Sequence, residues 1–333
     1  MKAWLHSNEK NLHCTLAGAT GTATVDGHPL IASTSDDPFT IRTRLVVVAP
    51  SQGYKFIATQ IDSLPGTAIV EFQHMHGRGV NERGFAYTWS GAPPNPEHEP
   101  DYSQAYGLPF QQFGRLLLSG AQSVNEAIEL LESNPRAIHG NFLFADASGE
   151  VALVEVSTHS LNVETRIHDG WLGRTNHWIS PQMARIGHYS GDKDSSTVRL
   201  DRIRALLEEG SGQLDVEFLA RCFRDHATLE KTTWSICAHG HNGSPDGICS
   251  GTVSSEIIQP AARTMYYCYG WPCGGQVAYP DAQLYQDRSW GYYLPFHLDD
   301  LEPGEYVTMD GRLTPLGIHY VAQGVARVPN KPS

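Results

Sequence analysis

The chain of 333 residues has few cysteines and no long apolar run, and each shortage excludes a class of protein. Six cysteines in this length do not resemble the disulfide framework of a small secreted domain. No stretch is long and apolar enough to cross a bilayer, and residues 1–13 lack the apolar segment of a secretory signal. The sequence therefore predicts a cytoplasmic protein with no membrane partner.

Positive charge is also scarce. Lysine and arginine total 24 against 36 aspartates and glutamates, so the net charge is −12. A protein that binds a nucleic-acid backbone needs clustered basic residues, and the sequence contains no glycine-rich phosphate loop. We therefore expect a small-molecule substrate, no nucleic acid and no cofactor, while homo-oligomerisation stays open.

The hydrophobic pattern predicts strands, two helices, strands, two helices and strands again. The predicted helices cover 109–119, a segment capped by Ser123 and Glu126, 196–209 and 215–226. The predicted strands cover 12–23, 29–35, 44–49, 55–61, 67–72, 84–89, 141–145, 150–156, 161–167, 171–176, 234–238, 251–258 and 264–269. Because strands and helices do not alternate strictly, we expect an α+β fold of antiparallel sheets covered by helices.

Cys14 is the first residue of interest, because it stands between a polar leader and a strand of small residues. By position alone it fits a buried structural cysteine. The following segment turns at Asp26-Gly27 and returns as a strand that ends in Asp36. This hairpin predicts that Asp36 lies beside Cys14.

Such an arrangement suits nucleophilic catalysis, since a thiolate attacks a carbonyl carbon. If the chain is cut between His13 and Cys14, the new α-amine belongs to the nucleophile's own residue. An α-amine has a pKa of roughly 7.7–8.0 and can act as the general base near neutral pH. A neighbouring carboxylate would orient that amine.

Several short motifs follow one another between residues 12 and 275. They are Cys14-Thr15, Asp26-Gly27, Asp36, Gly79-Val-Asn-Glu-Arg-Gly84, Phe144-Ala-Asp-Ala-Ser-Gly149, Arg174-Thr-Asn-His177, Ser196-Thr-Val-Arg-Leu-Asp-Arg202, Ser235-Ile-Cys-Ala-His239, Gly251-Thr-Val-Ser-Ser255 and Tyr269-Gly-Trp-Pro-Cys273. In this order they resemble the acyl-coenzyme A:6-aminopenicillanic acid acyltransferase family of N-terminal-nucleophile (Ntn) hydrolases. Choloylglycine hydrolases and penicillin V acylases are similar at a greater distance.

The resemblance implies a four-layer αββα sandwich of two antiparallel sheets and autoproteolysis before Cys14. It implies a leader over 1–13, an Ntn hydrolase domain over 14–280, and a C-terminal extension over 281–333 packed on the same domain. The implied activity is that of a self-processing amidohydrolase or acyltransferase. Its substrate would be a linear amide such as an N-acyl amino acid or small peptide, attacked through a thioester on Cys14.

The resemblance also carries over catalytic roles. Cys14 matches the nucleophile, Asp36 the carboxylate that holds the amine, and Asn176 an asparagine near the oxyanion or the amine. Arg199 matches an arginine that reaches the site from a helix. Each of the last three has an ordinary alternative: a turn at Asp36, a loop cap at Asn176, and an exposed or ion-paired helix residue at Arg199.

The chain departs from its distant relatives at two places. Choloylglycine hydrolases carry an arginine three residues before the aspartate, where this chain has Ser33. They have an oxyanion asparagine where this chain has Trp89, Ser90 and Gly91. We expect these three residues to bind substrate, with a backbone N–H near Ser90 or Gly91 as the second oxyanion donor.

A second group of residues is rich in sulfur and imidazole, comprising Cys237, His239, His241, Cys249, Cys268 and Cys273. Thiolates and imidazoles are zinc ligands, but the spacing matches no standard zinc motif. A core cysteine followed by a polar loop is the interpretation that this spacing favours, so no metal is expected. Two alternative functions stay open: a zinc-dependent hydrolase built on Cys237, His239 and Cys249, and a catalytically silent Ntn scaffold.

Overall fold

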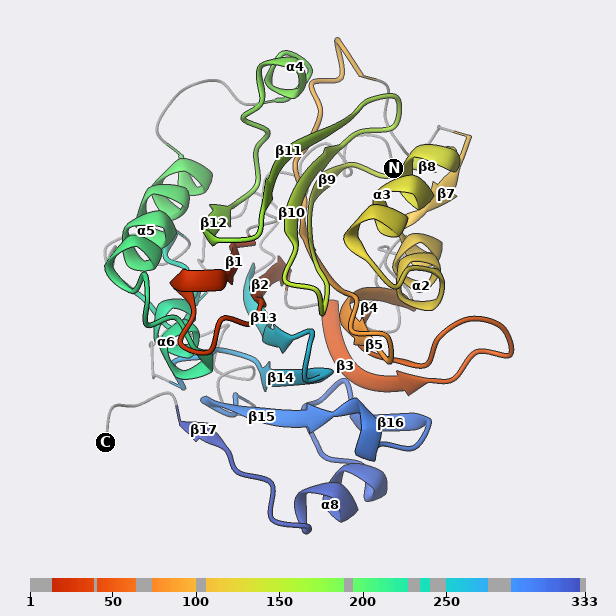
Figure 1. Ribbon diagram of the computed structural model, residues 1–333, viewed down its shortest axis with the longest axis vertical. Coiled ribbons are helices and arrows are strands. Elements are labelled where there is room, and N and C mark those ends of the chain that lie inside the picture. Colours follow the sequence, from red (N-terminus) through yellow and green to blue (C-terminus); the bar gives the residue numbers. More distant parts are fainter. Residues whose placement is uncertain are drawn as a thin grey trace.

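The computed structural model describes residues 14–38, 41–63, 74–99, 106–188, 194–226, 234–239, 250–274 and 289–329 (Figure 1). Most of its strands form two antiparallel sheets. The first has the order β12-β1-β2-β13-β14-β15-β17. Its strands are β12 (Gly170–Arg174), β1 (Leu16–Thr20), β2 (Leu30–Pro38), β13 (Ser250–Gln259), β14 (Thr264–Tyr269), β15 (Tyr292–His297) and β17 (Val328–Pro329).

The second sheet has the order β11-β10-β9-β6-β5-β4-β3-β16. Its strands are β11 (Leu161–Ile167), β10 (Val151–Val156), β9 (Gly140–Ala145), β6 (Ala86–Ser90), β5 (Met75–Asn81), β4 (Phe56–Ser63), β3 (Ile41–Val48) and β16 (Gly304–Val307). Two short strands, β7 (Leu108–Pro109) and β8 (Arg136–Ala137), pair in parallel beside it.

Helices cover the outer face of each sheet (Figure 1). The second sheet packs against α2 (Phe110–Gly120) and α3 (Val124–Ser133), and the first against α5 (Ser195–Glu209) and α6 (Val216–Phe223). Two shorter helices are α4 (Pro181–Ala184) and α8 (Pro315–Val321). The four-layer αββα order implied by the resemblance is confirmed.

Three apolar cores lie between these four layers. One joins α2 and α3 to the second sheet, the next lies between the two sheets, and the last joins the first sheet to α5 and α6. The sequence explains these contacts, since α2 buries Phe110, Phe113 and Leu117 on one face at helical spacing. Apolar burial therefore holds each sheet on both sides.

The helix ends follow the expected capping chemistry. The Ser123 hydroxyl accepts a hydrogen bond from the Glu126 N–H at 3.2 Å, which starts α3. The second half of the predicted capping box is absent at this end, because the Glu126 carboxylate binds the N–H of Gln122 instead. Asp194 and Asp215 cap α5 and α6 in the same manner.

Two strand predictions need comment. The predicted strand 234–238 is wrong, because these residues form a short turn and bends. The predicted strand 67–72 lies outside the described residues. The pattern also failed to indicate β5, since His76 and Arg78 sit where apolar residues are expected.

The C-terminal residues are built into both sheets. Strand β15 joins the first sheet beside β14, and β16 joins the second beside β3 (Figure 1). Among the described helices, none has the length and apolar character needed to span a membrane.

Candidate active site

Cys14 lies directly before β1, and the β1–β2 hairpin brings it to Asp36. The two strands pair with Leu16 opposite Ser33, and the Thr34 N–H donates to the Thr15 carbonyl at 3.0 Å. Gly27 supplies the left-handed turn residue with a φ of 76°. Asp36 lies near the end of β2, and a backbone hydrogen bond from it reaches the Cys14 sulfur. The predicted proximity of Cys14 and Asp36 is therefore present.

Asn176 and Arg199 hold the main chain of Cys14. The Cys14 N–H donates to Asn176 Oδ1 at 2.8 Å, and the Cys14 carbonyl accepts from Arg199 Nη1 at 2.6 Å. Arg199 Nη2 donates to the same Asn176 Oδ1 at 2.8 Å, and Asn176 Nδ2 donates to the Gly91 carbonyl at 2.9 Å. Asn176 therefore binds the main-chain nitrogen of Cys14, the atom that a cut before this residue would turn into the α-amine.

Arg199 reaches this position from the first turns of α5 and is fully buried. Its remaining hydrogen bonds go from Nη1 to Thr15 Oγ1 at 3.1 Å and from Nε to Ser195 Oγ at 3.1 Å. These hydrogen bonds go to main-chain or neutral side-chain oxygen atoms, while the Arg199 charge also acts on the nearby Asp36 carboxyl. Arg199 therefore holds the main chain at Cys14 in place.

The Asp36 carboxyl is buried, and its surroundings favour the protonated, uncharged form. Thr252 Oγ1 donates to Asp36 Oδ1 at 2.6 Å, and Thr34 Oγ1 lies 3.4 Å from Asp36 Oδ2. Burial raises the pKa of Asp36 to about 8, although the nearby Arg199 guanidinium opposes the shift. In the uncut chain the Cys14 N–H is bonded to Asn176, so the predicted contact between Asp36 and the amine stays a prediction for the cut form.

Burial also keeps the Cys14 thiol protonated. The side chain is 4% exposed, and desolvation raises its pKa to about 11, with the positive charge of Arg78 as the strongest opposing influence. Arg78 Nη2 lies 3.7 Å from the Cys14 sulfur. The Cys14 thiol thus lies beside a cation whose charge favours its thiolate.

Sequence reasoning missed Arg78. The residue lies in the middle of β5, and its Nη2 also donates to the carbonyls of Thr34 and Trp89 at 3.2 Å each. Its Nε lies 3.5 Å from Glu256 Oε2, and both side chains are at most 1% exposed. The available signal was a charged residue between Gly77 and Gly79, at the start of the motif that runs from Gly79 to Gly84.

Glu256 is the counter-charge of Arg78 and is anchored by three hydroxyls. Ser254 Oγ and Thr59 Oγ1 donate to Oε1 at 2.6 and 3.0 Å, and Ser33 Oγ donates to Oε2 at 3.3 Å. Burial raises the pKa of Glu256, while Arg78 opposes the shift. Ser33, where distant relatives carry an arginine, thus supports the ion pair that brings Arg78 to the sulfur.

The predicted substrate-binding segment frames the site with its main chain. The Trp89 ring packs against Phe110 with centroids 4.8 Å apart, in the core under α2, while its carbonyl accepts from Arg78. The Ser90 hydroxyl donates to the Thr175 carbonyl at 2.6 Å. Contact of Trp89, Ser90 and Gly91 with substrate stays a prediction.

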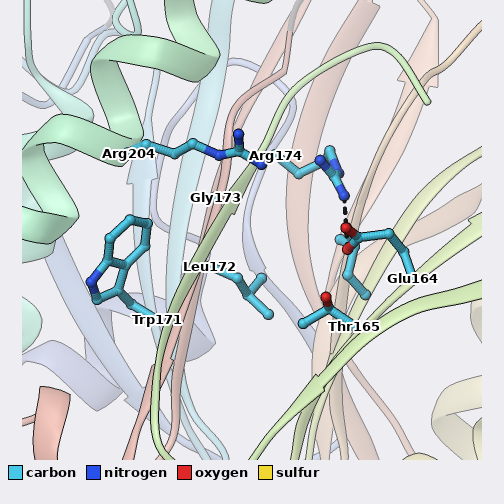
Figure 2. Close-up of a pocket in the computed structure, with 8 residues that line it drawn as sticks. Glu164, Thr165, Trp171, Leu172, Gly173, Arg174 and Arg204 are labelled. Atoms are coloured by element: carbon cyan, nitrogen blue, oxygen red, sulfur yellow. Dashed lines mark ion pairs between the residues drawn. The ribbon is translucent and has the colours of Figure 1, made fainter. Parts of the chain in front are cut away.

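A cavity of about 350 Å³ opens beside β12. One of its lining residues, Arg174, precedes Asn176 by two positions in the sequence. Its lining comes from β10, β11, β12 and α5, and includes Glu164, Arg174 and Arg204. Figure 2 shows the Arg174 guanidinium turned toward Glu164, with which it forms an ion pair at 2.9 Å. Neither Cys14 nor Asp36 lines this cavity.

Residues 24–273, three quarters of the chain, match the model of the family described as acyl-coenzyme A:6-aminopenicillanic acid acyl-transferase. The chain belongs to this family. The match begins after Cys14, so the position of that residue rests on the geometry above. No curated protein matches the sequence.

Solved structures of low identity share the fold of this family member. Two single-residue variants of the conjugated bile acid hydrolase from Clostridium perfringens align with TM-scores of 0.53 and 0.52 at 13% identity. Each alignment covers 90% of this chain and 98% or 99% of the other. Penicillin V acylase from Agrobacterium tumefaciens aligns with a TM-score of 0.46 at 15% identity, over 77% of this chain and 83% of the other.

Proposed function

We propose that this family member is a self-processing amidohydrolase or acyltransferase with Cys14 as its N-terminal nucleophile. One observation carries the proposal: three separate buried groups hold the three reactive parts of Cys14. Asn176 binds its nitrogen, Arg199 its carbonyl, and Arg78 lies beside its sulfur. A structural cysteine needs none of these contacts, because its thiol packs as a small apolar group.

In the processing step, the Cys14 sulfur attacks the carbonyl carbon of the residue before it. The S–C bond forms as the thiol proton leaves, the C–N bond breaks, and the nitrogen of Cys14 gains a proton to become an amine. Water then hydrolyses the thioester and releases residues 1–13 with a free carboxylate. Asn176 and Arg199 fix the nitrogen and carbonyl of Cys14 during this exchange.

In turnover, the new α-amine takes the proton of the Cys14 thiol. Arg78 favours the thiolate by its charge. The thiolate attacks the substrate amide, the leaving amine receives the proton, and an acyl thioester stays on Cys14. Water gives hydrolysis and an acceptor amine gives acyl transfer. Asn176 keeps the α-amine directed, since its Oδ1 already accepts from that nitrogen.

We further propose a linear amide as the substrate, such as an N-acyl amino acid or a small peptide. The family's description names an acyl-transferase, and the bile acid hydrolase shares the fold; both names are those of acyl-group chemistry. The neutral acyl thioester also suits a buried, water-poor site, since Cys14 is 4% exposed.

Intact-mass analysis and N-terminal sequencing of the purified chain test the proposal. We expect loss of 13 residues and a new N-terminus at Cys14. Cys14→Ala should leave the chain uncut and inactive, whereas Cys222→Ala, in the core beneath α6, should be cut as in the parent. Incubation with a panel of N-acyl amino acids should add one acyl mass to Cys14. A fully active protein that retains Met1 would contradict the proposal.

A further inference from the structure

Two cysteine and two histidine side chains form a second cluster, to which Cys14 does not belong. His226 follows α6, Cys237 and His239 belong to the segment 234–239, and Cys273 lies in the turn after β14. One ligand atom from each lies within 4.8 Å of every other. His239 Nε2 is 2.8 Å from His226 Nε2, 3.0 Å from Cys273 Sγ and 3.5 Å from Cys237 Sγ. Three chain segments thus meet at one point.

We propose that these four residues bind a zinc ion. Two thiolates and two imidazoles form a common structural zinc set, with Zn–S near 2.3 Å and Zn–N near 2.0–2.1 Å. A tetrahedron with these bond lengths has edges of roughly 3.3–3.8 Å, so only small side-chain shifts separate the observed contacts from coordination. Four protein ligands leave no open position, so the zinc is structural and does not activate water.

Hydrogen bonding alone does not account for the cluster. A ring nitrogen of a neutral imidazole carries either one N–H or one lone pair. His239 Nε2 nevertheless has three polar neighbours, and it is buried at 0% exposure. A shared cation removes this conflict, because each of the four atoms then directs a lone pair at the metal. The ring of His239 is already fixed for this purpose by stacking on Trp271, with centroids 4.2 Å apart.

The ligand set differs from the one weighed on the sequence. Cys237 and His239 are shared, but the structure adds His226 and Cys273, and Cys249 lies outside the described residues. Cys237, His239 and Cys273 all belong to the group that the sequence singled out, whereas His226, which precedes Cys237 by eleven residues, does not. The proposal is also distinct from a zinc hydrolase, since the catalytic chemistry stays at Cys14.

The zinc site is linked to the active site through Ala238. The Ala238 N–H donates to Thr252 Oγ1 at 2.9 Å, and the Thr252 N–H donates to the Ala238 carbonyl at 2.8 Å. Thr252 Oγ1 in turn donates to Asp36 Oδ1 at 2.6 Å. Coordination by Cys237 and His239 therefore fixes the residue between them and, through it, the orientation of Asp36. This consequence rests on the proposed function, whereas metal binding does not.

Elemental analysis of the purified full chain tests the site. We expect roughly one zinc per chain, as for a closed structural site, and metal near background in Cys273→Ser and His226→Ala. These two ligands are the partly exposed ones, so their replacement disturbs the core least. Cys222→Ala is the matched control and should keep its zinc. Cobalt exchanged into the site should give the visible absorption of a tetrahedral thiolate complex, lost in Cys273→Ser.

The alternative is a disulfide between Cys237 and Cys273. Parent protein without zinc above the level of Cys273→Ser, or with these two cysteines bonded in non-reducing peptide mapping, would overturn the proposal. Cys14→Ala separates this test from that of the proposed function. It should bind zinc as the parent does, although it is uncut, because Cys14 contributes no ligand.

Discussion

The guanidinium of Arg78 lies 3.7 Å from the sulfur of Cys14, although the two residues come from different sheets. Cys14 precedes β1 in the first sheet, and Arg78 lies in β5 of the second. The site is therefore formed where the two sheets face each other. Here the positive charge comes from the opposite sheet, and Ser33 binds its partner Glu256.

Removal of the Arg78 charge should make the Cys14 thiol less reactive. Arg78 lowers the thiol pKa against the effect of burial, so Arg78→Met should raise that pKa further above 9. A hydrogen bond to a charged group is worth about 1.5–3 kcal/mol, which predicts a roughly ten- to hundredfold slower alkylation at pH 8. Iodoacetamide labelling of Cys14 across pH, read by mass spectrometry, measures the shift.

Arg78→Met alone also leaves the Glu256 carboxylate without its ion-pair partner, so the variant needs a control. Arg78→Met combined with Glu256→Gln removes both charges and avoids a buried unpaired carboxylate. If the double variant folds like the parent and alkylates at the parent rate, Arg78 does not tune the thiol.

Cleavage before Cys14 should require the hydrogen-bond acceptor of the Asn176 side chain, and not only its volume. Asn176→Ala removes the oxygen that binds both the Cys14 N–H and Arg199 Nη2. Loss of these buried bonds should slow cleavage before Cys14 roughly ten- to hundredfold. Asn176→Asp keeps an acceptor at that position and should recover most of the rate. The appearance of the cut chain over time, followed by intact mass, gives both rates; equal rates in the two variants would exclude this role.

The raised pKa of Asp36 predicts a specific pH dependence of stability. Its pKa is about 8 in the folded chain against 3.8 ordinarily, so between these values the folded state holds a proton that the unfolded state has lost. The unfolded state binds fewer protons there, and the contribution of Asp36 to stability falls as pH rises from about 4 to about 8. Below pH 4 the full contribution is present, and above pH 8 it is constant.

Asp36→Asn should abolish this part of the dependence. In the uncut Cys14→Ala background, the free energy of unfolding of the Asp36→Asn variant, relative to the chain that retains Asp36, should rise between pH 4 and pH 8 and then level off. Urea unfolding at several pH values measures the difference, and the parallel contributions of Asp37 and Glu256 cancel in the comparison. A difference independent of pH would mean that Asp36 is ionised in the folded chain.

The layers and part of the site could be predicted because they depend on local signals. Apolar spacing indicated the four main helices, and the Asp26-Gly27 turn placed Asp36 beside Cys14. Arg78 and His226 could not be found in this way, since the residues that they approach, Cys14 and Cys273, are distant in the sequence. Arg78 acts on a residue 64 positions earlier, and His226 meets Cys273 after two strands have intervened. The charge on β5 also hid the strand itself, because buried ion pairs break the apolar pattern.

Arg199 and Arg78 should differ in what their replacement changes, because Arg78 is hydrogen-bonded to the Cys14 sulfur whereas Arg199 binds oxygen atoms around the Cys14 main chain. Arg199 Nη1 binds the Cys14 carbonyl and Thr15, and Nη2 binds Asn176. A lysine at this position keeps the positive charge but cannot reproduce the planar fork. Arg199→Lys should therefore slow cleavage and turnover roughly ten- to hundredfold, while the pH profile of Cys14 alkylation in the cut chain stays within about 0.5 pH unit of that of the cut parent. A change in that profile as large as in Arg78→Met would show that Arg199 acts on the thiolate by charge, and the distinction between positioning arginine and thiolate-stabilising arginine would fail.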